Sequence, residues 1–259
     1  MFPVFLRKRG TWTDLFRPVG FCDRKLSIDF FKNGYIRKTV GVLPNNILFN
    51  SKGTNSGLMK DETVDIRNFQ CRMISNKGKG SPIIFLHGYM FTSDVWNEVG
   101  LLRMLEQRNI PFKAIDMPYG KISESAPRTS SAEKNVALLS AVAGREPVIV
   151  GASLGGYIAL KYSVSNPVRG LLLAAPVMSM QEDLVKHYPD FKANVSIVYG
   201  DGDNIVSENE MKKLSKCFNA ELKVYKNASH PAYLDYPERF IEDVLELYGA
   251  ATGNENAHL

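Results

Sequence analysis

Short apolar runs alternate with amphipathic segments from residue 61 to residue 249. Runs rich in Val, Ile and Leu predict strands, and the first of them is long enough for a hairpin. The predicted strand segments are 63–75, 82–88, 112–118, 147–153, 169–177, 193–203 and 220–230. Apolar residues at helical spacing predict helices between them, within 94–109, 130–144, 154–166, 207–218 and 236–249.

Strands that are apolar on both faces are typical of a parallel sheet covered by helices on both sides. The pattern therefore predicts an α/β fold, a three-layer sandwich with a mostly parallel central sheet. Helix-end signals support this interpretation. Ser130 or Ser131 is a candidate N-cap, Gly144 a candidate stop, and Pro237 suits a first helical turn.

The first 58 residues differ from the rest in pattern and in charge. They contain ten Lys or Arg and three Asp, a charge of +7, whereas the remaining residues carry 22 basic and 24 acidic groups, a charge of −2. We therefore expect three parts: a basic, weakly ordered extension (1–58), one α/β domain (59–250) and a flexible tail (251–259). A targeting segment, or a basic arm that contacts an anionic surface, is the alternative for the extension.

Charge and cysteine usage exclude several classes. The basicity belongs to the extension, so no nucleic-acid partner is expected for the domain. No apolar stretch reaches the ~18 residues of a transmembrane helix. Cys22, Cys71 and Cys217 lie far apart, so neither a disulfide framework nor a metal site is expected. A reducing, cytoplasmic location is the default expectation.

The segment Gly151-Ala152-Ser153-Leu154-Gly155 forms a G-x-S-x-G motif between a predicted strand and a predicted helix. A sharp turn there requires small neighbours and holds the serine hydroxyl at the edge of the sheet. A serine nucleophile needs a base, and the base needs an orienting acid.

Asp203 and His230 follow the next strands along the chain in the order expected for that acid and that base. We expect Ser153, Asp203 and His230 to form a catalytic triad. Asp201, expected to accept hydrogen bonds within its turn, and Asp116 compete as the acid. His87 is expected to brace its own loop, and Asp235 to cap a helix or lie on the surface. Because the base must be neutral, activity should fall as the pH falls through the range in which imidazole protonates.

The oxyanion hole requires two backbone N–H groups. We expect them from Leu154, which follows the nucleophile, and from Tyr89, in the loop after the 82–88 strand. Apolar residues in the predicted loops are candidates for an acyl pocket, although core packing is an equal alternative for each. These residues are Met90, Phe91, Trp96, Tyr119 and Met178, with Tyr89 and Met180 as further candidates.

With His87-Gly88, the Ser153 turn, Asp203 and His230 in this order, residues 61–249 resemble the α/β-hydrolase superfamily. The connection 178–194 is too short for the helical cap found in many relatives. In this the chain resembles the small, capless abhydrolase-domain 14 proteins (CCG1-interacting factor B). That resemblance implies a compact hydrolase of short acyl esters, with acyl transfer to an acceptor such as coenzyme A in some relatives. The basic extension has no counterpart in the family pattern.

The resulting hypothesis is a serine hydrolase that cleaves short-to-medium acyl esters without a cofactor. The same triad could run acyl transfer, peroxyacid formation or C–C bond hydrolysis. From another class, a binding or adaptor protein could use the same fold. An intact set of Ser, Asp and His favours the enzyme.

Overall fold

The computed structural model describes residues 59–253, and the predicted extension 1–58 and tail residues 254–259 lie outside this range. The strands are β1 (Lys60–Ile66), β2 (Phe69–Ser75), β3 (Ile83–Leu86), β4 (Phe112–Ile115), β5 (Val148–Ala152), β6 (Gly170–Ala174), β7 (Asn194–Gly200) and β8 (Glu221–Tyr225). The helices are α2 (Asp94–Glu98), α3 (Leu101–Gln107), α4 (Ala132–Val142), α5 (Leu154–Ser163), α6 (Glu182–Val185), the 3₁₀ turn η2 (Tyr188–Asp190), α7 (Glu208–Phe218), α8 (Ala232–Asp235) and α9 (Pro237–Thr252).

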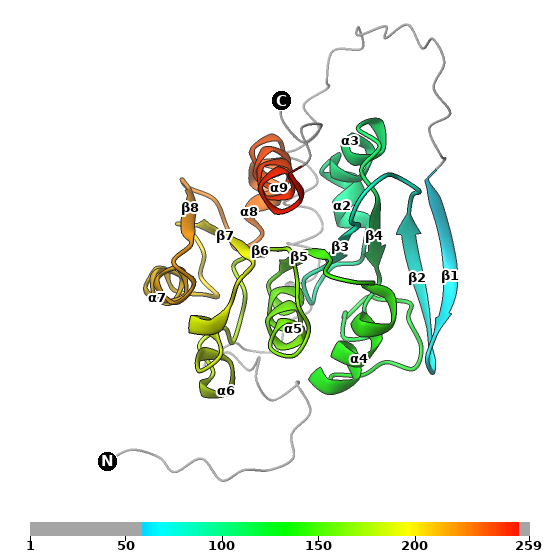
Figure 1. Ribbon diagram of the computed structural model, residues 1–259, viewed down its shortest axis with the longest axis horizontal. Coiled ribbons are helices and arrows are strands. Elements are labelled where there is room, and N and C mark those ends of the chain that lie inside the picture. Colours follow the sequence, from blue (N-terminus) through cyan, green and yellow to red (C-terminus); the bar gives the residue numbers. More distant parts are fainter. Residues whose placement is uncertain (1–58, 254–259) are drawn as a thin grey trace, which may run out of the picture. The chain divides into compact units, whose positions relative to one another are not determined.

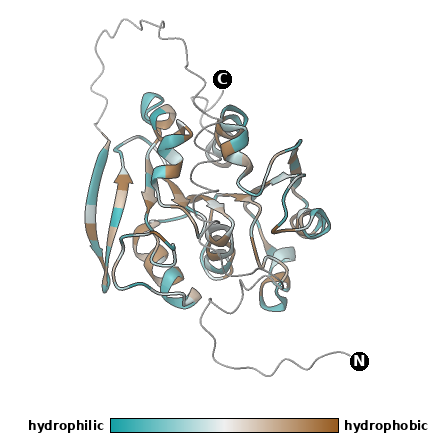
Figure 2. Cartoon of the chain, turned by 180° about the vertical axis from the view of Figure 1, so that it is seen from behind, coloured by the Kyte–Doolittle hydropathy of each residue, from teal (hydrophilic) through white to brown (hydrophobic). Residues whose placement is uncertain are grey.

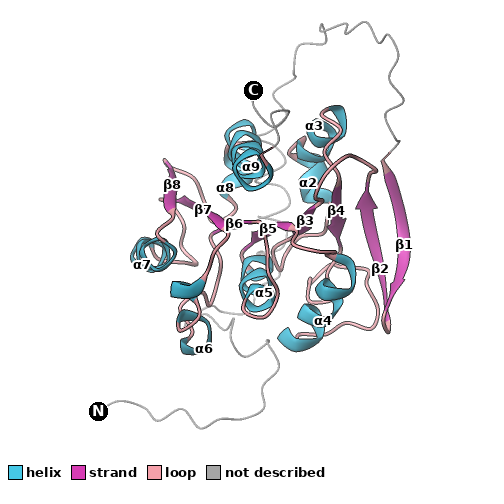
Figure 3. Cartoon of the chain, in the orientation of Figure 1, coloured by secondary structure: helices cyan, strands magenta, loops and turns pink. Residues whose placement is uncertain are grey.

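The strands form one sheet in the order β1-β2-β4-β3-β5-β6-β7-β8. Strands β3 to β8 are parallel, and the β1–β2 hairpin joins β4 antiparallel. Figure 1 shows α2, α3 and α9 on one face of the sheet and α4, α5 and α7 on the other, and Figure 3 separates these helices from the sheet by colour. The α/β sandwich predicted from the sequence is confirmed.

The central strands of the sheet are apolar, and the edge strand is mostly hydrophilic. Figure 2 shows apolar colours on the central strands and mostly hydrophilic colours on edge strand β1. Every residue of β3, β5 and β6 is buried, whereas most of β1 is exposed. The difference arises because helices cover both faces of the central strands.

The predicted helix 94–109 is interrupted in the structure. Gly100 adopts φ +80°, in the left-handed region, and separates α2 from α3. A left-handed residue ends the run of helical hydrogen bonds, so two short helices replace the single one. In α4, the Ser131 hydroxyl accepts a hydrogen bond from the Lys134 N–H, as expected of an N-cap. At the other end of the chain, α9 continues to Thr252, two residues beyond the predicted end of the domain.

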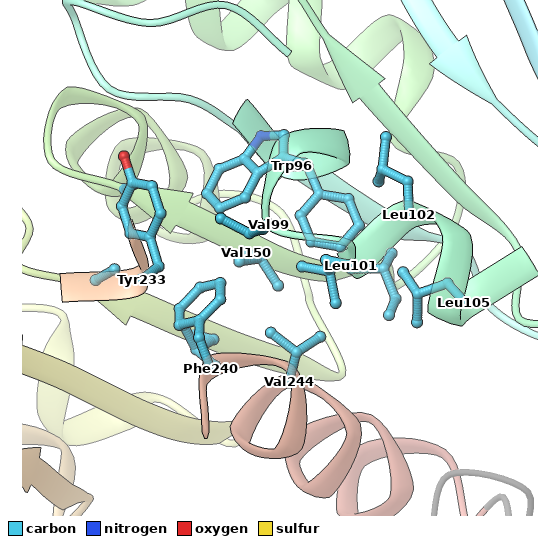
Figure 4. Packing of buried hydrophobic residues seen from close by; sticks show 14 of the residues in the cluster. Trp96, Val99, Leu101, Leu102, Leu105, Val150, Tyr233, Phe240 and Val244 are labelled. Atoms are coloured by element: carbon cyan, nitrogen blue, oxygen red, sulfur yellow. The ribbon is translucent and has the colours of Figure 1, made fainter. Parts of the chain in front are cut away.

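Aromatic side chains fill the layer between the sheet and α9. Trp96 is fully buried, stacks on Phe240 with ring centroids 6.0 Å apart and lies 5.2 Å from Tyr233 (Figure 4). The sequence left both pocket and core roles open for Trp96, and its burial is that of a core residue. Within residues 59–253, no helix has the length and apolar character needed to cross a membrane.

Candidate active site

Ser153 occupies a strained turn between β5 and α5. Its φ of +52° and ψ of −112° are unusual for a residue with a side chain. The turn depends on glycine, because a Cβ at position 155 would lie 2.3 Å from the Leu86 carbonyl oxygen. A Cβ at position 151 would likewise come within 2.8 Å of the Gly155 oxygen. The glycines therefore let the strand and the helix approach closely enough to hold the serine at the edge of the sheet.

The structure brings Ser153, His230 and Asp203 into one hydrogen-bonded chain. His230 Nε2 lies 2.8 Å from Ser153 Oγ, and His230 Nδ1 lies 2.7 Å from Asp203 Oδ2. The Asp203 side chain is fully buried, and the His230 side chain is 17% exposed. A carboxylate on Nδ1 selects the tautomer with Nδ1 protonated, which leaves Nε2 free to accept the serine proton.

The two competing aspartates of the β7 turn have different partners. Asp203 Oδ1 accepts hydrogen bonds from the N–H groups of Ile205 (2.7 Å) and Val206 (3.0 Å), which leaves Oδ2 for the histidine. Asp201 is exposed and accepts from the Asn227 N–H at 2.5 Å. The sequence predicts that Asp201 accepts within its own turn, but its bond instead joins the β7 turn to Asn227, which follows β8. Geometry selects Asp203 as the partner of the imidazole.

The loop that carries His230 is held from two sides. Asp235 Oδ2 accepts from the Ser229 N–H at 2.7 Å and from the Ser229 hydroxyl at 2.5 Å. A Cβ at Gly200 would lie 2.4 Å from the Ser229 carbonyl oxygen, so β7 passes directly against this loop. Asp235 thus anchors the histidine loop, a role that the sequence interpretation missed. The only sequence signal was its closeness to His230.

His87 braces the loop after β3, as predicted. Its Nε2 accepts from the Met117 N–H at 2.9 Å, so its Nδ1 carries the proton and donates to the Gly88 carbonyl oxygen at 2.8 Å. Burial lowers the pKa of His87 below its ordinary value. The imidazole is therefore neutral and held in one tautomer.

The first three carbonyl groups of the same loop have donors. His87 O accepts from the Tyr119 hydroxyl at 2.6 Å, and Tyr89 O accepts from the Lys121 N–H at 2.7 Å. Gly88 O accepts from His87 and from the Phe91 N–H. In a trans peptide the N–H points opposite to the C=O, so the bonds to Gly88 O also set the direction of the Tyr89 N–H. Leu154 is the first residue of α5, and its N–H has no acceptor within the helix.

Asp116, the third candidate acid, serves another element. Its Oδ1 accepts from the Ser93 N–H at 2.6 Å and from the Ser93 hydroxyl, and its carbonyl oxygen accepts from the Ser125 hydroxyl. These bonds tie the end of β4 to the start of α2 and to the following loop. The two serines gave no signal in the sequence, because their partners lie in other segments of the chain.

The remaining pocket candidates occupy different environments. Met90 is 43% exposed, whereas Tyr119 is buried with its hydroxyl on the His87 loop. Phe91 is partly buried and packs edge-on against Tyr233. Met178 is partly exposed and has φ +54°, close in sequence to Val177, whose N–H donates to Ser153 O. Met90 and Met178 therefore retain exposed surface, while Tyr119 and Trp96 contribute to the interior.

Within residues 59–253, no three His, Cys, Asp or Glu side chains gather in a way that could hold a metal ion.

Comparisons with known proteins identify the family and the fold of the chain. Residues 83–207 match the model of the alpha/beta hydrolase family. The chain is 30% identical over 173 residues, 64% of its own length and 81% of the relative's, to "Putative protein-lysine deacylase ABHD14B" of Pongo abelii. It is 28% identical over 171 residues to human "Protein ABHD14A", which covers 64% of this chain and 63% of that relative.

Among solved structures, a "predicted CIB-like hydrolase" from Thermoplasma acidophilum superposes with a TM-score of 0.65 at 22% identity. The match covers 74% of this chain and 98% of that one. This structural likeness concerns the fold.

Proposed function

The chain belongs to the alpha/beta hydrolase family, as an abhydrolase-domain 14-like protein, and from this premise we propose that it is a serine hydrolase of short-to-medium acyl esters. One observation carries the proposal. The hydrogen-bonded chain from Asp203 through His230 to Ser153, with distances of 2.7 and 2.8 Å, is the arrangement that activates a serine hydroxyl.

The proposed reaction has two steps. Ser153 Oγ attacks the ester carbonyl carbon while His230 Nε2 takes the hydroxyl proton, and the amides of Leu154 and Tyr89 stabilise the oxyanion. The ester C–O bond then breaks, the alcohol leaves with the proton from His230, and an acyl-enzyme remains. Water, deprotonated by His230, releases the carboxylic acid and restores Ser153.

A second candidate is hydrolysis of an acyl-lysine amide. It is favoured by the relatives named "Putative protein-lysine deacylase ABHD14B". The chemistry would be the same, except that His230 protonates an amine as the leaving group. The short connection between β6 and β7 contains only α6 and η2 as helical elements. It gives neither candidate a covering domain and leaves room for a large acyl-bearing substrate to approach.

The test is labelling with a fluorophosphonate probe, together with turnover of p-nitrophenyl esters from acetyl to octanoyl and of an acetyl-lysine peptide. Ser153→Ala should lose labelling and about 10⁴-fold or more in kcat. Ser165→Ala, an exposed serine beyond α5, is the matched control and should label like the wild type. A folded wild type that neither labels nor turns over any substrate would refute the proposal and favour a binding protein on a hydrolase fold.

A further inference from the structure

Four large apolar side chains are exposed in the part of the chain that the structure describes. They are Met90 (43% exposed), Ile122 (51%), Ile205 (57%) and Tyr236 (39%). Each lies in a segment that follows the carboxyl end of a parallel strand, namely β3, β4, β7 and β8. These four residues, the apolar rim, therefore share the edge of the sheet that carries Ser153. Their common position at this edge makes them candidates for a binding surface.

The rim lies on both sides of the candidate triad. Met90 and Ile122 belong to one flank, because the Lys121 N–H donates to Tyr89 O and joins their two loops. Ile205 belongs to the other flank, where its N–H donates to Asp203 Oδ1. In the sheet, β5 with its serine turn lies between the strands that lead to these two flanks.

The width of the rim excludes a single short acyl chain as its occupant. β4 and β7 have β3, β5 and β6 between them, and neighbouring strands are about 4.8 Å apart. Four such spacings separate the two flanks by about 19 Å. A six-carbon acyl chain, with carbon–carbon bonds of about 1.5 Å, is less than half as long. An apolar occupant that contacts both flanks must be an extended surface.

The position of the apolar rim around Ser153 further limits which occupants are possible. An occupant that bridges the flanks also covers Ser153, so turnover is possible only if the occupant itself supplies the acyl group. Exposed charges in the four rim segments balance, with three basic and three acidic groups: Lys121, Arg128, Lys226, Glu124, Asp201 and Asp235. This neutrality fits a surface without net charge. Exposed lysine stems beside apolar side chains, as at Lys121 and Ile122, suit an interface between water and lipid.

We propose that the apolar rim seats this edge of the sheet on a neutral or zwitterionic lipid phase and that the ester reaches Ser153 from that phase. This inference rests on the proposed acyl-ester hydrolysis. It makes Ile122 and Ile205 docking residues, which contact the lipid without taking part in the chemistry.

The experiment uses the full chain and has two arms. In the first, Ser153→Ala protein is floated with phosphatidylcholine vesicles, whose zero net charge offers no Coulombic attraction to the basic residues 1–58. In the second, wild-type turnover of tributyrin is followed below and above its solubility limit. The rim variant carries Ile122→Gln and Ile205→Gln. Val168→Gln, at a half-buried position at the opposite edge of the sheet, is the control. Equal melting temperatures of the variants establish that all are folded.

We expect flotation of the Ser153→Ala protein and a rise in turnover as the tributyrin phase forms. The rim substitutions should weaken partitioning about tenfold or more and remove the rise, because two apolar side chains no longer leave water. The Val168→Gln control should keep both effects.

Hydrolysis of dissolved ester without flotation or a rise would overturn the lipid inference and leave the proposed function standing. Rim-dependent binding to an acylated protein, without flotation, would overturn it as well. No hydrolysis of tributyrin in either state, dissolved or as a separate phase, would overturn the proposed function, and flotation would still test the lipid inference.

Discussion

Replacing Asp203 by Asn tests the proposed triad most directly, because the structure predicts which way the new amide turns. Asp203 Oδ1 accepts two backbone N–H bonds, from Ile205 and Val206, and Oδ2 accepts one from His230. An asparagine keeps the two backbone bonds only if its carbonyl oxygen takes the Oδ1 position. Its NH₂ group then faces His230 Nδ1, which must accept. The imidazole proton moves to Nε2, where it meets Ser153 Oγ and the base can no longer take the serine proton.

A triad held in the wrong tautomer loses about 10⁴ in kcat, or about 5.5 kcal/mol of transition-state stabilisation. Asp201→Asn is the matched control two residues away. Its side chain can still accept from the Asn227 N–H, and the loss of an exposed charge is worth about 1 kcal/mol or less. The assay is kcat for p-nitrophenyl acetate, with the melting temperature as a check of folding. An Asp203→Asn enzyme that kept a tenth of wild-type kcat would refute the tautomer argument. An Asp201→Asn enzyme whose kcat fell by about 10⁴ would refute it as well.

Three further predictions concern stability. Gly155→Ala places a Cβ 2.3 Å from the Leu86 oxygen and should lower the free energy of unfolding by about 1–3 kcal/mol or prevent folding. Urea unfolding measures this loss, and an unchanged midpoint would contradict the close approach. Trp96→Ala should lower the free energy of unfolding by about 3–5 kcal/mol, and Trp96→Phe by clearly less, because Phe keeps an aromatic ring in the core. Equal losses for the two variants would argue against this packing. Burial lowers the pKa of His87. Below about pH 6.5 the His87 imidazole therefore binds a proton in the unfolded chain but not in the folded chain. The stability from this group is present above that pH and declines as the pH falls below it, by up to about 1.4 kcal/mol per pH unit. His87→Gln should remove that part of the slope.

The strand-to-helix succession was predictable because burial on both faces leaves a direct trace in sequence, as in β3, β5 and β6. The interruption of the 94–109 helix was harder to predict. A glycine inside a helical pattern is tolerated in many helices, and Gly100 ends this one only because its backbone is left-handed. The choice between pocket and core for Trp96 likewise depended on Tyr233 and Phe240, more than a hundred residues further along the chain.

The chemistry that is available and its order along the chain follow from the sequence alone. Ser153, Asp203 and His230 each follow a strand, and parallel strands bring such positions to one edge of the sheet. Tertiary structure alone decided which groups touch. Asp201 and Asp203 both follow β7 and compete as the acid in the sequence, and it is the fold that gives two backbone donors and an imidazole to Asp203. Local propensity and periodicity act over a few residues, whereas these hydrogen bonds join segments brought together only when the whole sheet has formed.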